Sequence, residues 1–589
     1  MLSYIFLFFS SLIFLHPKKI ELKKDSSYAI IFSSFIFANL FLGFISLILI
    51  YLGKSNFPII LISIILFTFT FLIDKKSKNK ILNLKNFISS EFKKFIDFNS
   101  HDDKEKKILY FILFIFILIF ISSIGPINHP DASDYHVGYP YQYYIRGKFF
   151  IDGGLTQGLL GISEYANLAF IQERMIWLIR TLQIINLPFL ILFLTNKIRN
   201  NILILAFLSV PTFIQWSTIG KPFFLGESSL IIIFLIWNQT KDSQDLKLLL
   251  MSAISCMTFK ISSLIIIFPM FLAYLNYLSN NKYSLKAVFQ ESKKIIVSKE
   301  IILTTIILTT LLISKLIITG NFIYPLFTNL FNKNDQLIND FSNNIFNYAR
   351  NDSYILNIFI PIKKTYLASS LGPTILIILF TLILKKSKKL LLKIDTIFLV
   401  TVSQLILLLT FCQRRSDFYA APLILIIFQS KQIKSVLFNF KIKYLFFISL
   451  IFQVSLIVLL TFLSIYTNIN SFINYKNTMY KTAYGFSLSS MIDPNLDGNI
   501  LIEDRNTRLY YPKNYIDVDK MRNCRLRNKN LGFDANDICL KKYNINQVIS
   551  DINYKANRNF FDCHIINSFK ASRNFFRQIK DSTKYCIRK

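Results

Sequence analysis

A short segment after a long apolar run combines carboxylates with aromatic side chains. In PDASDYHVGYP, Asp131 and Asp134 are followed at once by Tyr135 and His136. Residues three and four apart share a helix face, so Asp131, Asp134 and Tyr135 would lie together. A carboxylate there can take a proton from an acceptor hydroxyl, and Tyr rings can stack on sugars. The same pattern is typical of a helix start, with Asp131 as N-cap and Asp134 in a capping box.

Cations that could neutralise a leaving phosphate occur in three short segments. FCQRRSDFYAAP contains Arg414 and Arg415, STIGKPFF contains Lys221, and MTFKISS contains Lys260. Each segment borders an apolar run, so each is expected at a helix mouth. Arg and Lys bind phosphate through charge-assisted hydrogen bonds. The sequence therefore predicts that these four residues bind a phosphate-bearing substrate, with lipid headgroups as the alternative partner.

The elements that must position these residues are predicted to be membrane-spanning helices. The chain has 589 residues, 53% of them hydrophobic, including 60 Phe. Its apolar runs are near-continuous rather than amphipathic, which is typical of transmembrane helices of roughly 17–25 residues. A net charge of +33 would indicate nucleic acid in a soluble protein, but Lys-rich cytoplasmic loops explain it better here. We therefore expect membrane lipids as partners, and no nucleic acid.

The predicted fold class is an all-α polytopic membrane protein of about fourteen transmembrane helices, with a small extracytoplasmic α/β domain at the C-terminus. The opening run lacks a basic n-region and a small-residue cleavage site, so we expect a retained span rather than a cleaved signal. The predicted spans are 2–16, 28–52, 57–73, 108–125, 172–195, 200–216, 224–238, 246–260, 262–278, 300–320, 370–386, 393–412, 417–430 and 443–467.

Charge bias orients these spans. With fourteen of them, basic loops such as HPKKIELKKD and KKSKKLLLK all fall on one side, which is predicted to be cytoplasmic. Residues 1–467 would form the transmembrane domain, with outer loops 126–171 and 321–367. Residues 468–589 would form the extracytoplasmic domain, because strand-like pieces (NILIED, INQVIS, DCHIIN) alternate with helix-like pieces.

Cysteine usage agrees with that orientation. The tail contains Cys524, Cys539, Cys563 and Cys586. Four cysteines allow three pairings, of which we favour the sequential ones, 524–539 and 563–586. Disulfides would require an oxidising compartment. Zinc binding is the less favoured alternative, because the tail has no CxxC pair.

The segment DPNLDGNILIED has the spacing of a calcium loop. Asp493, Asn495, Asp497 and Asp504 would supply oxygen ligands, with Gly498 at the turn. The favoured interpretation is a polar turn that enters a strand, because the usual exiting helix is missing. No cofactor is firmly predicted, although a divalent cation is an option at this segment.

Taken together, these features resemble the GT-C superfamily of membrane glycosyltransferases. PDASDYHVGYP is similar to an Asp-x-x-x-Tyr-His element in related uncharacterised bacterial multispanning proteins, and TGNFIYPLF resembles their small-Gly-Asn-x-x-Tyr-Pro loop. ILIEDRNTRLYY and FKASRNFF resemble their terminal α/β module. The resemblance implies that Asp131 is the catalytic base with Asp134 as its substitute, and that His136, Tyr135 and Tyr324 bind substrate.

The resemblance also implies a reaction and a location. A sugar would pass, with inversion, from a polyprenyl-phosphate donor to a hydroxyl of a glycan, lipid or protein acceptor. The place would be the outer face of a bacterial inner membrane. The alternatives are a polymerase, ligase or flippase of lipid-linked glycans, or a non-catalytic membrane protein whose tail binds partners. A flippase would place its charges at mid-membrane depth, whereas a transferase would gather them at the outer face.

Overall fold

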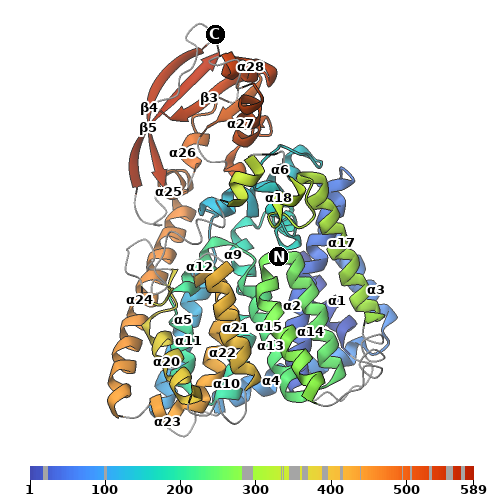
Figure 1. The fold of residues 1–589 in the computed structure, drawn as a ribbon, viewed down its shortest axis with the longest axis vertical. Coiled ribbons are helices and arrows are strands. Elements are labelled where there is room, and N and C mark those ends of the chain that lie inside the picture. The colour runs from blue at the N-terminus through green and yellow to red at the C-terminus, as the bar shows by residue number, and fades with distance from the viewer. Residues whose placement is uncertain are drawn as a thin grey trace.

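The computed structural model consists of a helical bundle and a small sheet-containing unit at the C-terminus (Figure 1). The long helix α24 at the edge of the bundle leads directly into this unit. We call the end of the bundle next to the unit the sheet end. The structure describes all residues except 17–23, 98–102, 281–295, 333–334, 336, 344–357, 361–368, 388–394, 412–415, 438–439, 484, 494, 496, 504–506, 529–533, 552–560, 572–577 and 589.

Helices form at the apolar runs because only intrachain hydrogen bonds can satisfy the backbone of so apolar a segment. The first half of the bundle contains α1 (Leu2–Leu15), α2 (Lys24–Tyr51), α3 (Ile59–Ile73), α4 (Ser77–Asp97), α5 (Asp103–Ser122), α6 (Gly138–Arg146), α7 (Ile162–Tyr165), α8 (Asn167–Gln172), α9 (Ile179–Leu182), α10 (Leu187–Ile198), α11 (Asn201–Leu208), α12 (Thr212–Ile219), α13 (Phe224–Thr240), α14 (Ser243–Phe259) and α15 (Leu264–Asn280).

The second half completes the bundle and connects it to the C-terminal unit. Short π- or 3₁₀-helical turns, written η, link several of the helices. The second half contains α17 (Lys299–Thr319), α18 (Thr328–Phe331), α20 (Pro373–Ser387), α21 (Thr396–Phe411), η7 (Ser416–Phe418), α22 (Ala420–Ser430), α23 (Lys434–Leu437), α24 (Phe440–Ile473), α25 (Tyr475–Thr482) and α26 (Phe486–Ser489).

Several helices are compatible with a multi-pass membrane protein. Among the described residues, five segments are long and apolar enough to cross a membrane: Asp25–Tyr51, Ile176–Ile198, Ile261–Leu278, Lys299–Thr319 and Ile442–Ile473. A sixth is obtained if α11 and α12, which meet at 55°, count as one span. Pro211 lies at this break, and proline interrupts a helix because it lacks an N–H group. This count is smaller than the predicted fourteen.

Helix α4 lies where the sequence predicted only a basic loop. Its Lys80 ammonium donates to the carbonyl oxygens of Ile13 and His16, both at 2.9 Å, and so satisfies the open end of α1. The buried Glu91 on the same helix accepts a hydrogen bond of 3.0 Å from the Tyr28 hydroxyl. A Lys-rich helix therefore packs against the bundle through a few buried polar contacts.

The C-terminal unit contains a five-stranded mixed sheet in the order β2-β1-β3-β5-β4. Strands β1 (Asn499–Ile502), β2 (Tyr515–Ile516) and β3 (Ile545–Asp551) are parallel, while β4 (Phe561–Ala571) and β5 (Gln578–Arg588) run antiparallel to each other, with β5 also antiparallel to β3. The predicted strand-like pieces therefore lie in β1, β3 and β4. Helices α27 (Val518–Arg527) and α28 (Asp534–Lys542) fill the connection between β2 and β3.

Two disulfides cross-link this unit. One joins Cys524 of α27 to Cys539 of α28, and the other joins Cys563 of β4 to Cys586 of β5. These are the sequential pairs favoured from the sequence. Cys524, Cys539 and Cys586 are buried in the small apolar core that also contains Leu501 and Val548.

Replacing Cys524 and Cys539 together with Ser is expected to destabilise the C-terminal unit by about 3 kcal/mol, the typical contribution of a bridge that closes a loop of about 15 residues, which is the spacing here. The measurement is amide hydrogen exchange of the α27 and β3 peptides in the full chain, under non-reducing conditions. Unchanged exchange in the double variant would contradict the stabilising role of this bridge.

Candidate active site

The segment that carries the predicted acids follows α5 at the sheet end of the bundle. After α5 the chain turns into η1 (Ala132–His136), a single π-helical turn, and then into α6. Asp131 occupies the position before η1, but its carboxylate makes no capping hydrogen bond there. The turn is instead held by the Ser133 hydroxyl, which donates to the carbonyl oxygen of His129 at 3.1 Å. The Asp131 carboxylate is therefore available for contacts outside its own turn.

Asp131 pairs with a predicted cation. The ammonium of Lys221, in the turn between α12 and α13, lies 2.9 Å from Asp131 Oδ2 and 3.8 Å from Asp417 Oδ2. The side chain of Asp131 is 18% exposed, whereas those of Lys221 and Asp417 are 9% and 2% exposed. Gly220, with φ of 72°, ends α12 in the left-handed conformation and brings Lys221 into place. The structure thus brings one predicted acid and one predicted cation together at a partly open position.

Lys260 lies in the neighbouring turn, between α14 and α15. Its ammonium is 3.7 Å from the ring centroid of Phe223 and 5.1 Å from that of Phe418, so two aromatic faces stabilise its charge. Phe223 follows Lys221 in the chain by two residues, and Phe418 follows Asp417. The rings that contact Lys260 therefore belong to the same two segments as Lys221 and its partner Asp417. Arg414 and Arg415 lie outside the described residues.

His136 forms a buried dyad with Glu164. Its Nδ1 is 2.9 Å from Glu164 Oε1, and the Gly161 backbone N–H donates to Glu164 Oε2 at 2.8 Å. Burial lowers the pKa of His136, and the hydrogen bond to Glu164 opposes this change without reversing it. A neutral ring that donates from Nδ1 keeps a lone pair on Nε2. This Nε2 is buried without a hydrogen-bond partner among the described residues, so it can accept a hydrogen bond.

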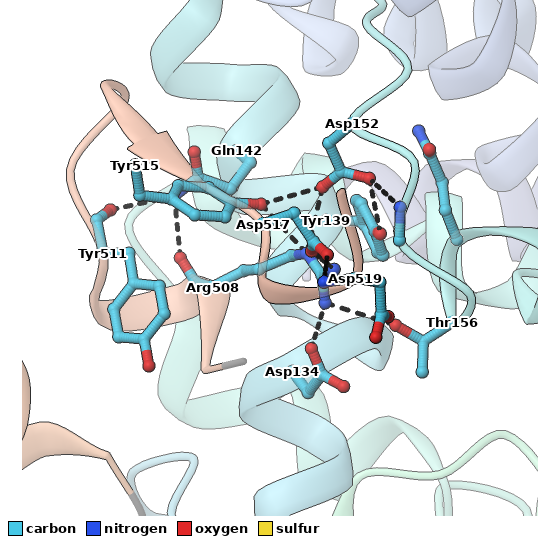
Figure 2. Close-up of polar contacts among 12 residues, drawn as sticks. Asp134, Tyr139, Gln142, Asp152, Thr156, Arg508, Tyr511, Tyr515, Asp517 and Asp519 are labelled. Carbon is cyan, nitrogen blue, oxygen red and sulfur yellow. Dashed lines mark hydrogen bonds and ion pairs between the residues drawn. The ribbon is translucent and has the colours of Figure 1, made fainter. Parts of the chain in front are cut away.

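Asp134 belongs to a buried ion cluster around Arg508 (Figure 2). Arg508, in the C-terminal unit, forms ion pairs with Asp134, Asp152 and Asp517. Its Nε also donates to the Tyr515 hydroxyl at 2.9 Å. The structure therefore places Asp134 in a contact between the bundle and the C-terminal unit, whereas Asp131 remains beside Lys221.

The tyrosines around this cluster complete its hydrogen bonding. The Tyr139 and Tyr515 hydroxyls donate to the two oxygens of Asp152 at 3.0 and 2.9 Å. The Arg508 guanidinium carbon lies 4.1 Å from the centroid of the Tyr139 ring. Burial raises the pKa of both tyrosines well above the ordinary value, and the charge of Arg508 opposes this shift. Both hydroxyls therefore stay protonated and act as donors.

The remaining predicted residues lie around these two groups. The Tyr135 ring is partly buried, 4.0 Å from the His136 ring. Tyr324 is buried, and its hydroxyl donates to the Leu155 carbonyl oxygen at 3.1 Å. Tyr324 therefore supports the loop 151–161 through this hydrogen bond.

The possible calcium segment is described only in part, because residues 494 and 496 lie outside the described residues. The Asp493 carboxylate accepts a hydrogen bond of 2.9 Å from the Asn495 backbone N–H, and Asn546 donates to the Asp497 carbonyl oxygen. Asp504 lies outside the described residues. Within the described part of the chain, no group of three or more His, Cys, Asp or Glu side chains is arranged to hold a metal ion.

Sequence patterns did not identify Glu164, Asp152 or Arg508 as neighbours of the predicted acids. Glu164 is 28 residues from His136, and Arg508 is 374 residues from Asp134. The available signal was chemical, since a loop rich in acids and tyrosines needs a cation when it is buried. Comparisons with protein-family models, curated proteins and solved structures found no match for this chain. Its function is therefore inferred from the site and the architecture.

Proposed function

We propose that this chain is a membrane glycosyltransferase of the GT-C type. It transfers a sugar from a polyprenyl-phosphate donor to an acceptor hydroxyl on the extracytoplasmic side of a bacterial inner membrane. Asp131 is the general base, and Lys221 and Lys260 receive the donor phosphate. The acceptor is a glycan, a lipid or a protein.

The observation that carries this proposal is the contact between Asp131 and Lys221 at the sheet end of the bundle. Transfer from a phosphate-linked sugar needs a base for the attacking hydroxyl and a cation for the leaving phosphate. In this pair the two groups lie 2.9 Å apart, with the acid the more exposed of the two. When the anionic phosphate approaches, it competes for the Lys221 ammonium and leaves the carboxylate free to accept a proton.

The reaction follows from these roles. Asp131 takes the proton of the acceptor hydroxyl as that oxygen attacks the anomeric carbon. A new C–O bond forms, and the bond between the anomeric carbon and the phosphate oxygen breaks on the opposite face, so the configuration inverts. Because the sugar then lies between base and phosphate, the Lys221 ammonium must leave Asp131 and follow the phosphate. The polyprenyl phosphate leaves with the electron pair, and the two ammonium groups offset its charge. The His136–Glu164 dyad supplies a hydrogen-bond acceptor for a second hydroxyl of the substrate.

The membrane setting is supported by the apolar surface of the bundle. The central helix α2 has 78% of its most apolar window buried, whereas α24 has 39% and α17 has 33%. Large side chains such as Ile448, Ile451 and Phe472 on α24 are more than half exposed. Exposed apolar faces of this extent indicate contact with lipid. We therefore propose that further apolar helices of the bundle cross the membrane beside the long ones, up to about fourteen spans in all.

The proposed orientation rests on charge and on the disulfides. Basic residues at the ends of α10 and α22, such as Lys197 and Lys431, lie at the end of the bundle opposite the sheet end (Figure 1). By the positive-inside rule that end is cytoplasmic. The C-terminal unit, with its two disulfides, then lies in the oxidising compartment where such bridges persist.

The distribution of ion pairs favours a transferase over a flippase. The pairs among the described residues lie in loops or near helix ends, such as Lys197–Asp25 and Lys221–Asp131. A transport path would need charged groups near the membrane midplane. Charge at the sheet end instead suits chemistry at the membrane surface.

A transfer assay tests the proposal. The purified full-length protein, in liposomes, is given a panel of radiolabelled polyprenyl-phosphate sugars with membrane lipids and lipid-linked glycans as acceptors. We expect label to pass from at least one donor to an acceptor. Absence of transfer from every donor, with protein shown to be folded by its thermal transition, would refute the proposed function.

A further inference from the structure

The turn that carries Asp131 is held on both sides by one short element of the C-terminal unit. This element is η9 (Arg508–Tyr510), a 3₁₀ turn between β1 and β2. The Tyr510 hydroxyl donates to the carbonyl oxygen of Ile127, four residues before Asp131. Arg508 pairs with Asp134, three residues after it. Two residues of η9 therefore bind the chain before and after the proposed base, one by a hydrogen bond and one by an ion pair.

Neighbouring residues hold η9 in its contact with the loop and leave space for the Arg508 side chain. The Gln142 side-chain amide, on α6, donates to the carbonyl oxygens of Arg508 and Tyr511 at 2.7 and 2.8 Å (Figure 2). A Cβ atom on Gly154 would lie 2.4 Å from Arg508 Nη2, and one on Gly138 would lie 3.0 Å from Arg508 Cβ. A side chain at Gly154 would therefore collide with the guanidinium, and one at Gly138 would crowd the first carbon of the Arg508 side chain. Such close packing distinguishes a built interface from a loose contact between two domains.

Residues at the carboxyl edge of the sheet make a second contact with the loop 126–171. Residues Asp517 and Asp519 follow β2 and begin α27, and the Asp519 carboxylate accepts a hydrogen bond of 3.1 Å from the Leu155 backbone N–H. The carboxyl edge of parallel strands is where open α/β sheets usually bind ligands. Here that edge is occupied by the loop 126–171 of the same chain. The carboxyl edge of the sheet therefore contacts the bundle loop that carries Asp131.

We propose that η9 fixes the position of the Asp131 turn, with Arg508 and Tyr510 as positioning residues, so that the C-terminal unit completes the active site rather than binding a separate partner. A base must lie within hydrogen-bond reach of the proton that it removes. Displacement of a reacting group by about 1 Å can cost about a hundredfold in rate. The effect on catalysis rests on the proposed function, whereas the contacts of Arg508 and Tyr510 with the Asp131 turn do not.

Three variants and a matched control test this proposal. Tyr510→Phe removes only the hydroxyl that holds Ile127. Arg508→Met removes the charge, and Arg508→Lys restores the charge without the planar fork. The control is Arg525→Met, because Arg525 pairs with Glu503 inside the same unit and does not reach the loop. In each full-length protein, hydrogen exchange is measured for peptides covering 126–136, with β3 peptides as the report on the unit's own fold.

We expect faster exchange of residues 126–136 in Tyr510→Phe and Arg508→Met, unchanged exchange in Arg525→Met, and an intermediate rate in Arg508→Lys. Unchanged exchange of this turn in both Tyr510→Phe and Arg508→Met would overturn the proposal, whether or not the protein transfers sugar. If Arg508→Met also loses protection in β3, its result is discarded and Tyr510→Phe decides.

The transfer assay then tests the catalytic consequence. We expect kcat to fall about tenfold in Tyr510→Phe and about a hundredfold in Arg508→Met, while KM for the donor stays near the wild-type value. Lys221 and Lys260, which bind the phosphate, keep their places in these variants, so donor binding should persist. A loosened turn with unchanged kcat would overturn the positioning role, and failure of the wild-type protein to transfer any sugar would refute the proposed function but leave the exchange test standing.

Discussion

Asp131→Asn is expected to lower kcat for sugar transfer by about 10²- to 10⁴-fold, the usual contribution of a general base. Asn has nearly the same shape as Asp but cannot accept the proton of the acceptor hydroxyl at neutral pH. Lys221 keeps its second partner, Asp417, at 3.8 Å, so the variant does not leave a buried ammonium unpaired. We therefore expect the loss to appear in turnover, with the thermal transition close to that of the wild type.

The matched control for this variant is Asp103→Asn. Asp103 lies in the first turn of α5, the helix that leads to the Asp131 segment, and its side chain is 92% exposed. This substitution changes the net charge by the same amount, at the far end of the helix that leads to the site, so its turnover should equal that of the wild type. Initial rates at saturating donor decide the matter. Turnover in Asp131→Asn that stays above about a tenth of the wild-type value would remove Asp131 from the role of base.

Much of the helical architecture can be predicted from the apolar runs, because a long apolar segment has few alternatives to helix. The number of membrane spans is harder to predict, because it depends on the length of each helix. Helix α1 has 14 residues and α22 has 11, so each spans roughly 16–21 Å, less than the roughly 30 Å of a bilayer core. The sequence ranges 2–16 and 417–430 were already shorter than a full span, and the helices end earlier still, because hydropathy marks an apolar run but not where its helix ends. Helix α4 was missed because it has no long apolar run. Its buried face is narrow, and its sequence is rich in Lys.

The candidate site could be predicted in its chemistry but not in its partners. Asp131 and Lys221 were identified by residue type at expected helix mouths, and the structure brings them into contact. Asp134 was predicted with the same role, because it lies on the same local pattern. Its partner, Arg508, stands in the polar stretch NTRLYY, and no local period shows that this guanidinium will be fully buried. Long-range ion pairs of this kind depend on how the two parts of the chain dock, which a single sequence does not encode in any short pattern.

The docked cluster carries a further expected result, in the pH dependence of stability. Asp517 caps the start of α27, where its carboxylate accepts from the Asp519 backbone N–H at 2.8 Å, and it pairs with Arg508. Burial raises the pKa of Asp517 to about 8, the charge of Arg508 opposes this shift, and Asp152 and Asp519 add to it. Asp134 shares the same guanidinium from the bundle side. One cation therefore pairs with three buried carboxylates, and we expect the cluster to retain a proton near neutral pH.

The sign of the effect is set by proton binding. The unfolded chain releases the Asp517 proton near pH 4, whereas the folded protein holds it up to about pH 8, so stability is greatest at low pH and falls across that interval. The slope reaches at most about 1.4 kcal/mol per pH unit for one proton. Asp517→Asn keeps the helix cap, since Asn is also a good N-cap, and it mimics the protonated acid. The variant should therefore lack this fall, and its stability relative to the wild type should rise as the pH increases from about 5 to about 8.

Hydrogen exchange of the α27 peptides in the full chain, across this pH range and corrected for the intrinsic rate, measures the difference. The remaining groups that face Asp517 are Tyr139 and Tyr515, whose pKa values are raised well above the ordinary value, so they do not titrate in this interval. Asp562→Asn is the control, because Asp562 is exposed on β4 of the same unit. Parallel stability curves for Asp517→Asn and the wild type would mean that the cluster holds no proton and that Arg508 balances its acids in another way. A curve that diverges only for Asp517→Asn would show that the cluster between the bundle and the C-terminal unit binds a proton in this pH interval.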